Sequence, residues 1–169
     1  AVPHVKLVGN LVSGSEQQTQ VLVDAGITAT LSHAIATVAR SEDVNKAACF
    51  ALSNIASGTD AQSAAVASEA SLITRVLALL NSSTSDQTKP KAFHAIQNIC
   101  DSNDEAALES LAATDVVAQL CANDMQASTR FPDVALETLF SLLEWGEGKG
   151  ADSNVILDAA AACDATAAV

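Results

Sequence analysis

Three asparagines, Asn10, Asn54 and Asn98, recur at an interval of 44 residues, and an apolar residue follows each of them. A side-chain amide offers two N–H donors and a carbonyl acceptor, which are the groups that bind a peptide backbone. If the three amides share one face, they form a ladder that can hold an extended peptide. The alternative is that they cap or bridge neighbouring helices.

The elements that must position this ladder are expected to be helices. The chain is 49% hydrophobic but only 3% aromatic and contains no Tyr, a composition that favours closely packed helices over strands. A period in the low forties is typical of stacked HEAT or armadillo repeats. Each cycle contains a short, a medium and a long helical pattern, which favours armadillo repeats, whose apolar faces are buried on their neighbours.

We therefore predict an all-α fold, a right-handed superhelical armadillo-repeat solenoid over residues 1–169, with about three full repeats plus flanking helices. Repeat boundaries are expected near residues 41, 84 and 128. Gly26 should end one helix as its C′ residue, and Pro90 falls in the first turn of the helix that carries Asn98. Apolar spacing and turn residues predict helices over 2–13, 16–25, 27–39, 44–56, 61–68, 72–80, from about 86 through Asn98, 104–112, 115–122, 130–145 and 153–162.

The charge of the chain limits its partners. With 8 basic and 20 acidic residues, the net charge is −12. Nucleic acids and anionic membranes require basic surfaces, so neither is expected as a partner. The acidity is compatible with a basic partner or serves solubility alone. No apolar stretch reaches the ~20 residues of a membrane-spanning helix, and helical pattern from the first residues leads us to expect a piece of a longer solenoid.

Neither a metal site nor an active site is expected. The three histidines lie in different predicted repeats, and GxSxG, P-loop and HExxH motifs are absent from the sequence. We therefore predict no enzyme activity, no catalytic residue, no metal and no cofactor. Trp145 is expected to pack in the core. No CxxC or zinc-spaced pair occurs among the four cysteines, which are Cys49, Cys100, Cys121 and Cys163. Three of them lie in apolar stretches, as buried free thiols do. Reduced thiols fit a cytosolic or nuclear compartment.

Several stretches resemble the importin-alpha family of nuclear-import adaptors. They are residues 8–14 (VGNLVSG), 18–26 (QTQVLVDAG), 51–58 (ALSNIASG) and, near the end of the chain, 134–144. The resemblance spans most of the chain and corresponds to the C-terminal half of that family's armadillo solenoid, around repeats six to ten. It implies that the third helix of each repeat lines a peptide-binding groove.

In that family an Asn on each third helix grips the backbone of the cargo peptide, and a Trp four residues earlier packs on the stem of a cargo lysine. At the Trp positions this chain has Lys6, Phe50 and His94, and where the family often has Glu it has Ala47 and Lys91. An aromatic face attracts a cation, whereas a second positive charge repels it. The predicted peptide-binding residues are Asn10, Asn54, Asn98, Lys6, Phe50, His94 and Ser53.

Two functions follow from these residues. The first is a nuclear-import adaptor of the cytoplasm and nucleus that binds basic cargo peptides, with importin-beta and an export receptor as partners of the full-length protein. The second is a divergent armadillo scaffold that has lost lysine recognition and mediates protein–protein interaction through its faces. The missing Trp residues and Lys91 motivate the second.

Overall fold

The computed structural model describes residues 2–37, 41–81, 87–102 and 104–114, together with residues 116, 118, 138, 140–142 and 144–145. The main ranges form helices joined by short turns. The helices are α1 (Val2–Leu11), α2 (Glu16–Asp24), α3 (Ile27–Thr37), α4 (Glu42–Ala56), α5 (Asp60–Ala67), α6 (Ala70–Asn81), α7 (Lys89–Cys100) and α8 (Glu105–Ala112).

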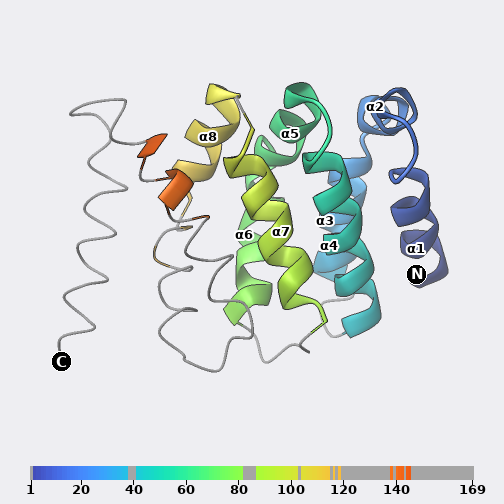
Figure 1. Cartoon of the computed structure of the whole chain (residues 1–169). Coiled ribbons are helices and arrows are strands. Elements are labelled where there is room, and N and C mark those ends of the chain that lie inside the picture. Colours follow the sequence, from blue (N-terminus) through green and yellow to red (C-terminus); the bar gives the residue numbers. More distant parts are fainter. Residues whose placement is uncertain are drawn as a thin grey trace.

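The helices stack in a repeating order. The long helix α4 contacts α1 on one side and α7 on the other, and α3 and α6 pack behind this row. The short helices α2, α5 and α8 lie along one edge of the molecule (Figure 1). Equivalent helices of successive repeats are thus neighbours, which brings residues that are 44 positions apart in the sequence side by side.

The core runs continuously from one repeat into the next. On α4, the side chains of Val44, Ala48, Leu52 and Ile55 are fully buried, and their spacing places them on the same side of a helix. The residues left accessible on α4 include Asp43, Lys46, Phe50 and Asn54, again at helical spacing. Packing therefore leaves α4 one narrow accessible stripe, and that stripe is mostly polar.

Within the described residues the predicted helices agree with the structure in place and order, and their boundaries differ by one to three residues. The helix that carries Asn98 begins at Lys89 rather than near residue 86, with Pro90 in its first turn as predicted. The first helix ends at Leu11 rather than at residue 13, and α6 begins at Ala70. Gly26 adopts a φ of +79° directly after α2, as expected of a C′ residue.

Part of the sequence-based prediction falls beyond these helices. The boundaries near 84 and 128 lie outside the described residues, as do most of the helices predicted over 115–122, 130–145 and 153–162. Trp145 is described and packs, partly buried, against the hydrophobic core, as predicted. In the described ranges no single helix is long and apolar enough to cross a membrane; only α5 and α6 together, bent by 79°, reach that length and composition.

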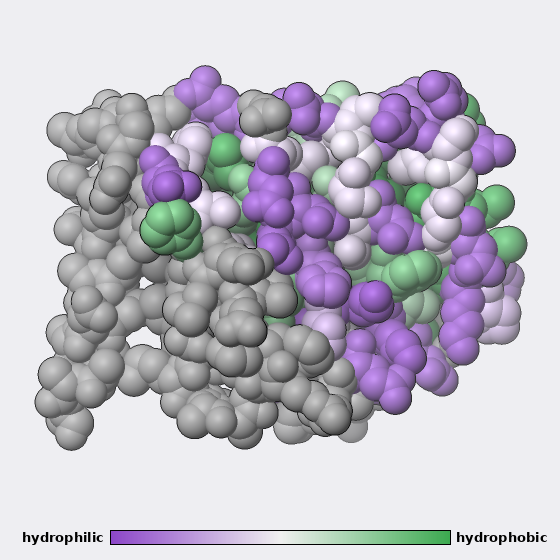
Figure 2. All heavy atoms as spheres, in the orientation of Figure 1, coloured by the Kyte–Doolittle hydropathy of each residue, from purple (hydrophilic) through white to green (hydrophobic). Residues whose placement is uncertain are grey.

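The surface is largely polar with a few apolar side chains. Hydrophilic residues cover most of the face over α4 and α7, and a small apolar area lies over α4 (Figure 2). At the α1 side of the molecule, Leu7 and Val21 are 56% and 67% exposed. They belong to α1, which packs mainly on α4, and to α2, which packs on α3 and α5.

Two of the short helices begin with the same hydrogen-bonded box. At α2 the Ser15 hydroxyl accepts the Gln18 N–H, and the Gln18 side chain accepts the Ser15 N–H at 3.0 Å. At α5 Thr59 and Gln62 repeat this arrangement. Such a box satisfies two backbone donors that the first turn of a helix leaves without partners. Gln62 is buried and also donates to the Glu16 carbonyl at 2.9 Å, so the cap joins two repeats.

The box explains the glycine that precedes it. A Cβ on Gly14 would lie 2.2 Å from Gln18 Oε1, and a Cβ on Gly58 would lie 2.0 Å from Gln62 Oε1. The glutamine amide therefore occupies the space that a side chain at the glycine would need. In the third cycle Ala107 replaces the glutamine, and the residue at the glycine position is Asn103.

We expect Gly58→Ala to lower the free energy of unfolding by about 1 kcal/mol, because the new methyl group displaces the amide that completes the α5 cap. In a Gln62→Ala background the same change should cost clearly less, since no amide is left to displace. Urea unfolding followed by far-UV circular dichroism measures both values and hence their coupling.

Gly26→Ala is the matched control for this cycle. Its positive φ makes any alanine strained, by about 1–2 kcal/mol, and no atom lies within 4 Å of its Cβ position. Its cost should be the same with Gln62 or Ala at position 62. Equal costs of Gly58→Ala in the two backgrounds would mean that Gln62 does not determine the glycine.

Candidate functional site

The asparagine ladder lies on the accessible stripe of α1, α4 and α7, which we call the third-helix face. Asn98 on α7 donates its side-chain N–H to the Ser53 carbonyl on α4 at 2.8 Å, with the Ser53 hydroxyl at 3.4 Å. Ser53 lies near the C-terminal end of its helix, where backbone carbonyls lack intrahelical partners or share them. Asn98 thus ties one repeat to the end of the preceding long helix.

Asn54 makes the equivalent connection through one additional group. Its side-chain N–H donates to the Ser13 hydroxyl at 2.7 Å, and that hydroxyl donates to the Gly9 carbonyl at 2.7 Å. Gly9 and Ser53 both directly precede a ladder asparagine, so the same carbonyl position is reached in both repeats. The Ser13 hydroxyl lies between the Asn54 amide and the Gly9 carbonyl, whereas the Asn98 amide contacts the Ser53 carbonyl directly.

Two of the three asparagines therefore bridge helices, which was the alternative considered from the sequence. The Asn54 amide donates to one acceptor and the Asn98 amide to two, both on Ser53, and within the described residues the amide oxygens accept no hydrogen bond. Asn10 is exposed and makes no side-chain hydrogen bond in the described ranges. Peptide binding by the ladder remains a prediction. The carbonyl oxygen of each amide is available in the described ranges to accept a hydrogen bond from a peptide.

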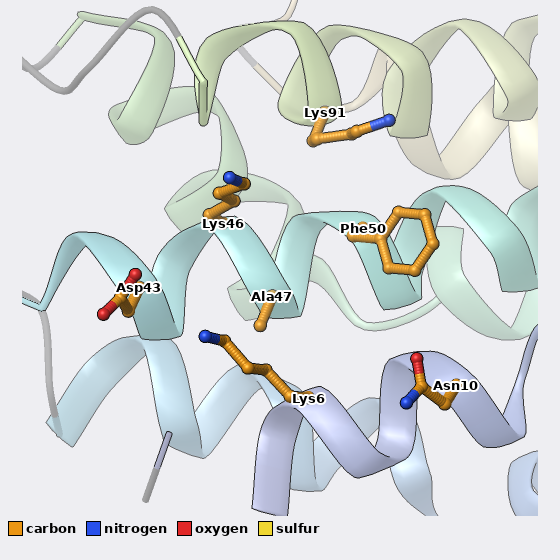
Figure 3. Close-up of a pocket in the computed structure, with 7 residues that line it drawn as sticks. All are labelled: Lys6, Asn10, Asp43, Lys46, Ala47, Phe50 and Lys91. Carbon is orange, nitrogen blue, oxygen red and sulfur yellow. The ribbon is translucent and has the colours of Figure 1, made fainter. Parts of the chain in front are cut away.

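A pocket of about 280 Å³ opens on the third-helix face where α1, α4 and α7 meet, and we call it the Phe50 pocket. It contains the predicted residues Asn10, Lys6 and Phe50. Figure 3 shows Lys6 and Asn10 extending from α1 toward α4, and Lys91 reaching over from α7. The full lining is Lys6, Asn10, Asp43, Lys46, Ala47, Phe50 and Lys91.

Phe50 is the aromatic wall of this pocket. The ammonium nitrogen of Lys91 lies over the ring, 5.2 Å from its centroid, within the range of a cation–π contact. The ring also packs against Gly9, where a Cβ would lie 3.1 Å from Phe50 Cδ1. The aromatic face that the family resemblance assigns to a cargo lysine is thus already covered by a lysine of this chain.

The other predicted site residues lie nearby on the same face. His94 follows Lys91 by one helical turn of α7, and burial followed by the Lys91 charge lowers its pKa from 6.5. A lowered pKa favours the neutral imidazole near pH 7. Asn54 lines a second pocket of about 290 Å³, together with Ser13, Gly14 and Gln62. The ladder therefore borders two recesses rather than one.

Two pocket residues were missed by the sequence analysis. Lys46 lies four residues before Phe50, and Asp43 lies seven residues before it. Both spacings place the side chain on the same side of the helix as the ring. Extending the accessible stripe from Phe50 toward the helix N-terminus would have found them. The importin-alpha resemblance did not predict these two residues, because its motif covers only the Asn, Trp and Glu positions.

The buried thiols have no role at this face. Burial and the nearby Glu42 raise the pKa of Cys49 to about 12, and burial followed by Asp101 raises the pKa of Cys100 as well. Both thiols therefore stay protonated near neutral pH and are poor nucleophiles and metal ligands. In the parts of the chain that the structure describes, no group of three or more His, Cys, Asp or Glu residues could hold a metal ion.

Solved structures with a similar fold include engineered proteins and designed armadillo repeat proteins. One engineered protein matches with a TM-score of 0.74 and 24% identity over 94% of this chain and 36% of its own. A designed armadillo repeat protein matches with a TM-score of 0.69 and 25% identity over 86% of this chain and 63% of its own. A designed armadillo repeat protein in complex with the peptide (KR)4 matches with a TM-score of 0.67 and 24% identity, over 90% of this chain and 72% of its own.

These matches establish the architecture. The chain has an all-α armadillo-repeat solenoid fold, as predicted, and spans about a third of the first engineered protein and under two thirds of the second. No protein-family model and no curated protein sequence matches the chain. The importin-alpha resemblance is therefore supported as far as the armadillo fold.

We expect Asn98→Ala to destabilise the protein by about 1 kcal/mol relative to Asn10→Ala, because only Asn98 bonds to the preceding repeat. The change in helix propensity is the same for both substitutions, so it cancels in the comparison. Urea unfolding of the two variants measures the difference. Equal stabilities would show that the bridge contributes nothing net to repeat stacking.

We expect the His94 pKa to lie below 6.5, and Lys91→Met to raise it only in part, since burial is the larger cause. An NMR pH titration of the imidazole tests both points. Because the unfolded chain then binds more protons, the His94 contribution to stability is present above pH 6.5 and is lost as pH falls toward the folded pKa. His94→Gln should remove this part of the pH dependence of stability. A measured His94 pKa at or above 6.5 would contradict the prediction.

Proposed function

We propose that this armadillo-repeat solenoid is a protein-interaction module that holds an extended peptide segment of a partner against its third-helix face. The observation that carries the proposal is the Phe50 pocket, where the exposed Asn10 amide stands beside an aromatic wall. Function is inferred from this site, since the fold alone hosts many.

Each component of the face matches a need of an extended chain. The backbone of such a segment presents N–H and C=O groups that lack partners, and amides supply both donors and acceptors. An apolar wall accommodates side-chain carbon atoms. Stacked repeats offer these groups at regular intervals, as a periodic ligand requires. The designed armadillo protein that was solved with (KR)4 provides a precedent for peptide binding by this fold.

The second candidate function is the nuclear-import adaptor implied by the importin-alpha resemblance. The VGNLVSG and ALSNIASG stretches favour it. It would add basic nuclear-localisation cargo, importin-beta and an export receptor as partners, and shuttling between cytoplasm and nucleus. The Phe50 pocket does not favour a lysine-rich cargo, because Lys6, Lys46 and Lys91 line it. This function would have to rely on residues outside the pocket.

Panning a display library of random octapeptides against the chain tests the first candidate. We expect enriched sequences whose affinity, measured by fluorescence anisotropy, falls at least about fivefold in Phe50→Ala and in Asn10→Ala, as for an interface residue worth about 1 kcal/mol. Asn10 is exposed, so its replacement preserves the fold even if Phe50→Ala does not.

Thr74→Ala is the control, because Thr74 is an exposed residue of α6 on the other layer. Its affinity for the enriched peptides should be that of the parent chain. If nothing is enriched, or if binding survives both Phe50→Ala and Asn10→Ala, the third-helix face is not the binding surface. If only lysine- and arginine-rich sequences are enriched, the adaptor becomes the better candidate.

A further inference from the structure

Building on the proposed peptide-binding function, we propose that the Phe50 pocket selects an acidic peptide. In this arrangement glutamate or aspartate side chains of the segment meet the ammonium groups of Lys6, Lys46 and Lys91, while Asn10 binds the backbone. The peptide-binding function could hold for a neutral segment; the sign of the charge is the added element.

The pocket is positive in a protein that is strongly negative. Three of the eight basic residues of the chain line it, against one carboxylate, that of Asp43. The lining thus has two more positive than negative charges, while the chain as a whole carries −12. With 20 acidic residues available, an unmatched group of three lysines in one recess is complementary to an anionic ligand.

In the described ranges no ion pair holds the lysines of the pocket. Within the described residues Lys6 and Lys91 form no hydrogen bond or ion pair, and Lys46 donates only to the neutral Gln87 side chain. Ammonium groups that share a recess repel one another, and the effect grows where the walls exclude water. A carboxylate placed among them replaces this repulsion with attraction.

The contact between Lys91 and Phe50 favours the same ligand. A cationic side chain could reach the ring only by displacing Lys91, which lies 5.2 Å from its centroid. An anionic side chain leaves that contact in place and pairs with the outer side of the same ammonium group. Figure 3 shows Lys6 and Lys91 reaching in from the helices on either side of α4. A ligand lying across α4 would therefore meet both.

Local and long-range electrostatics make opposite predictions, so they can be separated. The net charge of −12 attracts a basic peptide and repels an acidic one at long range. A preference for an acidic peptide can then come only from a local site. Near physiological salt, where the Debye length is about 8 Å, long-range terms are largely screened and the local pairs remain.

The test uses three fluorescent octapeptides, acetylated and amidated at their ends, in which Thr alternates with Glu, Gln or Lys. At roughly 0.15 M salt we expect the Glu peptide to bind at least about tenfold more tightly than the isosteric Gln peptide. Lys6→Gln and Lys91→Gln should each weaken it about three- to tenfold. Lys89→Gln removes the same charge from α7 but lies outside the pocket, and should change affinity less than about twofold.

Each other result overturns the inference in a distinguishable way. Equal binding of the Glu and Gln peptides removes charge selection and leaves peptide binding intact. Tightest binding of the Lys peptide reverses the preferred charge and supports a basic cargo. An equal loss in Lys89→Gln and Lys91→Gln excludes the pocket as the origin of the preference. Failure of all three octapeptides and of the random library removes the proposed function as well.

Discussion

The burial of the long helix α4 by the helices around it is the constraint on which the rest of this structure depends. α4 has its apolar side chains fully buried because α1, α3, α5 and α7 cover them. Such a helix has no core of its own, since apolar surface removed from water supplies most of the stabilisation. Covering it from three sides leaves a single accessible stripe. The position of Phe50 and of the ladder follows from this packing.

The fold could be predicted from the sequence because period, apolar spacing and turn residues all indicated the same helices. Boundaries were most accurate where the terminating residue has a backbone preference, as Gly26 does at φ +79°. The start of α7 was misplaced, because a proline is tolerated anywhere in a first turn and so does not mark one position. Bridging by the asparagines was an alternative reading of the sequence, but the partner, such as Ser53 for Asn98, could not be predicted, since it depends on the relative position of two helices.

The candidate site was predictable by position and less so by chemistry. The 44-residue interval placed Asn10 and Phe50 on one face, as the structure does. What it could not reveal is that Lys91 covers the ring and that Lys46 belongs to the same recess. An aromatic residue at a recognition position predicts a cationic ligand only if no lysine or arginine of the chain already covers its ring. Exposed contacts of this kind contribute about 0.5–1 kcal/mol, enough to compete with a weakly held ligand side chain.

The hydrogen bonds that join the repeats also define what a transferable unit of this chain is. Asn54 depends on Ser13, Asn98 on Ser53, and Gln62 on the Glu16 carbonyl, so each connection has one partner in either repeat. A repeat copied or exchanged between its apparent boundaries would carry only half of every connection. In evolution or in recombination, a duplicated repeat therefore keeps its connections only if its new neighbour supplies the matching serine or backbone carbonyl at the same position.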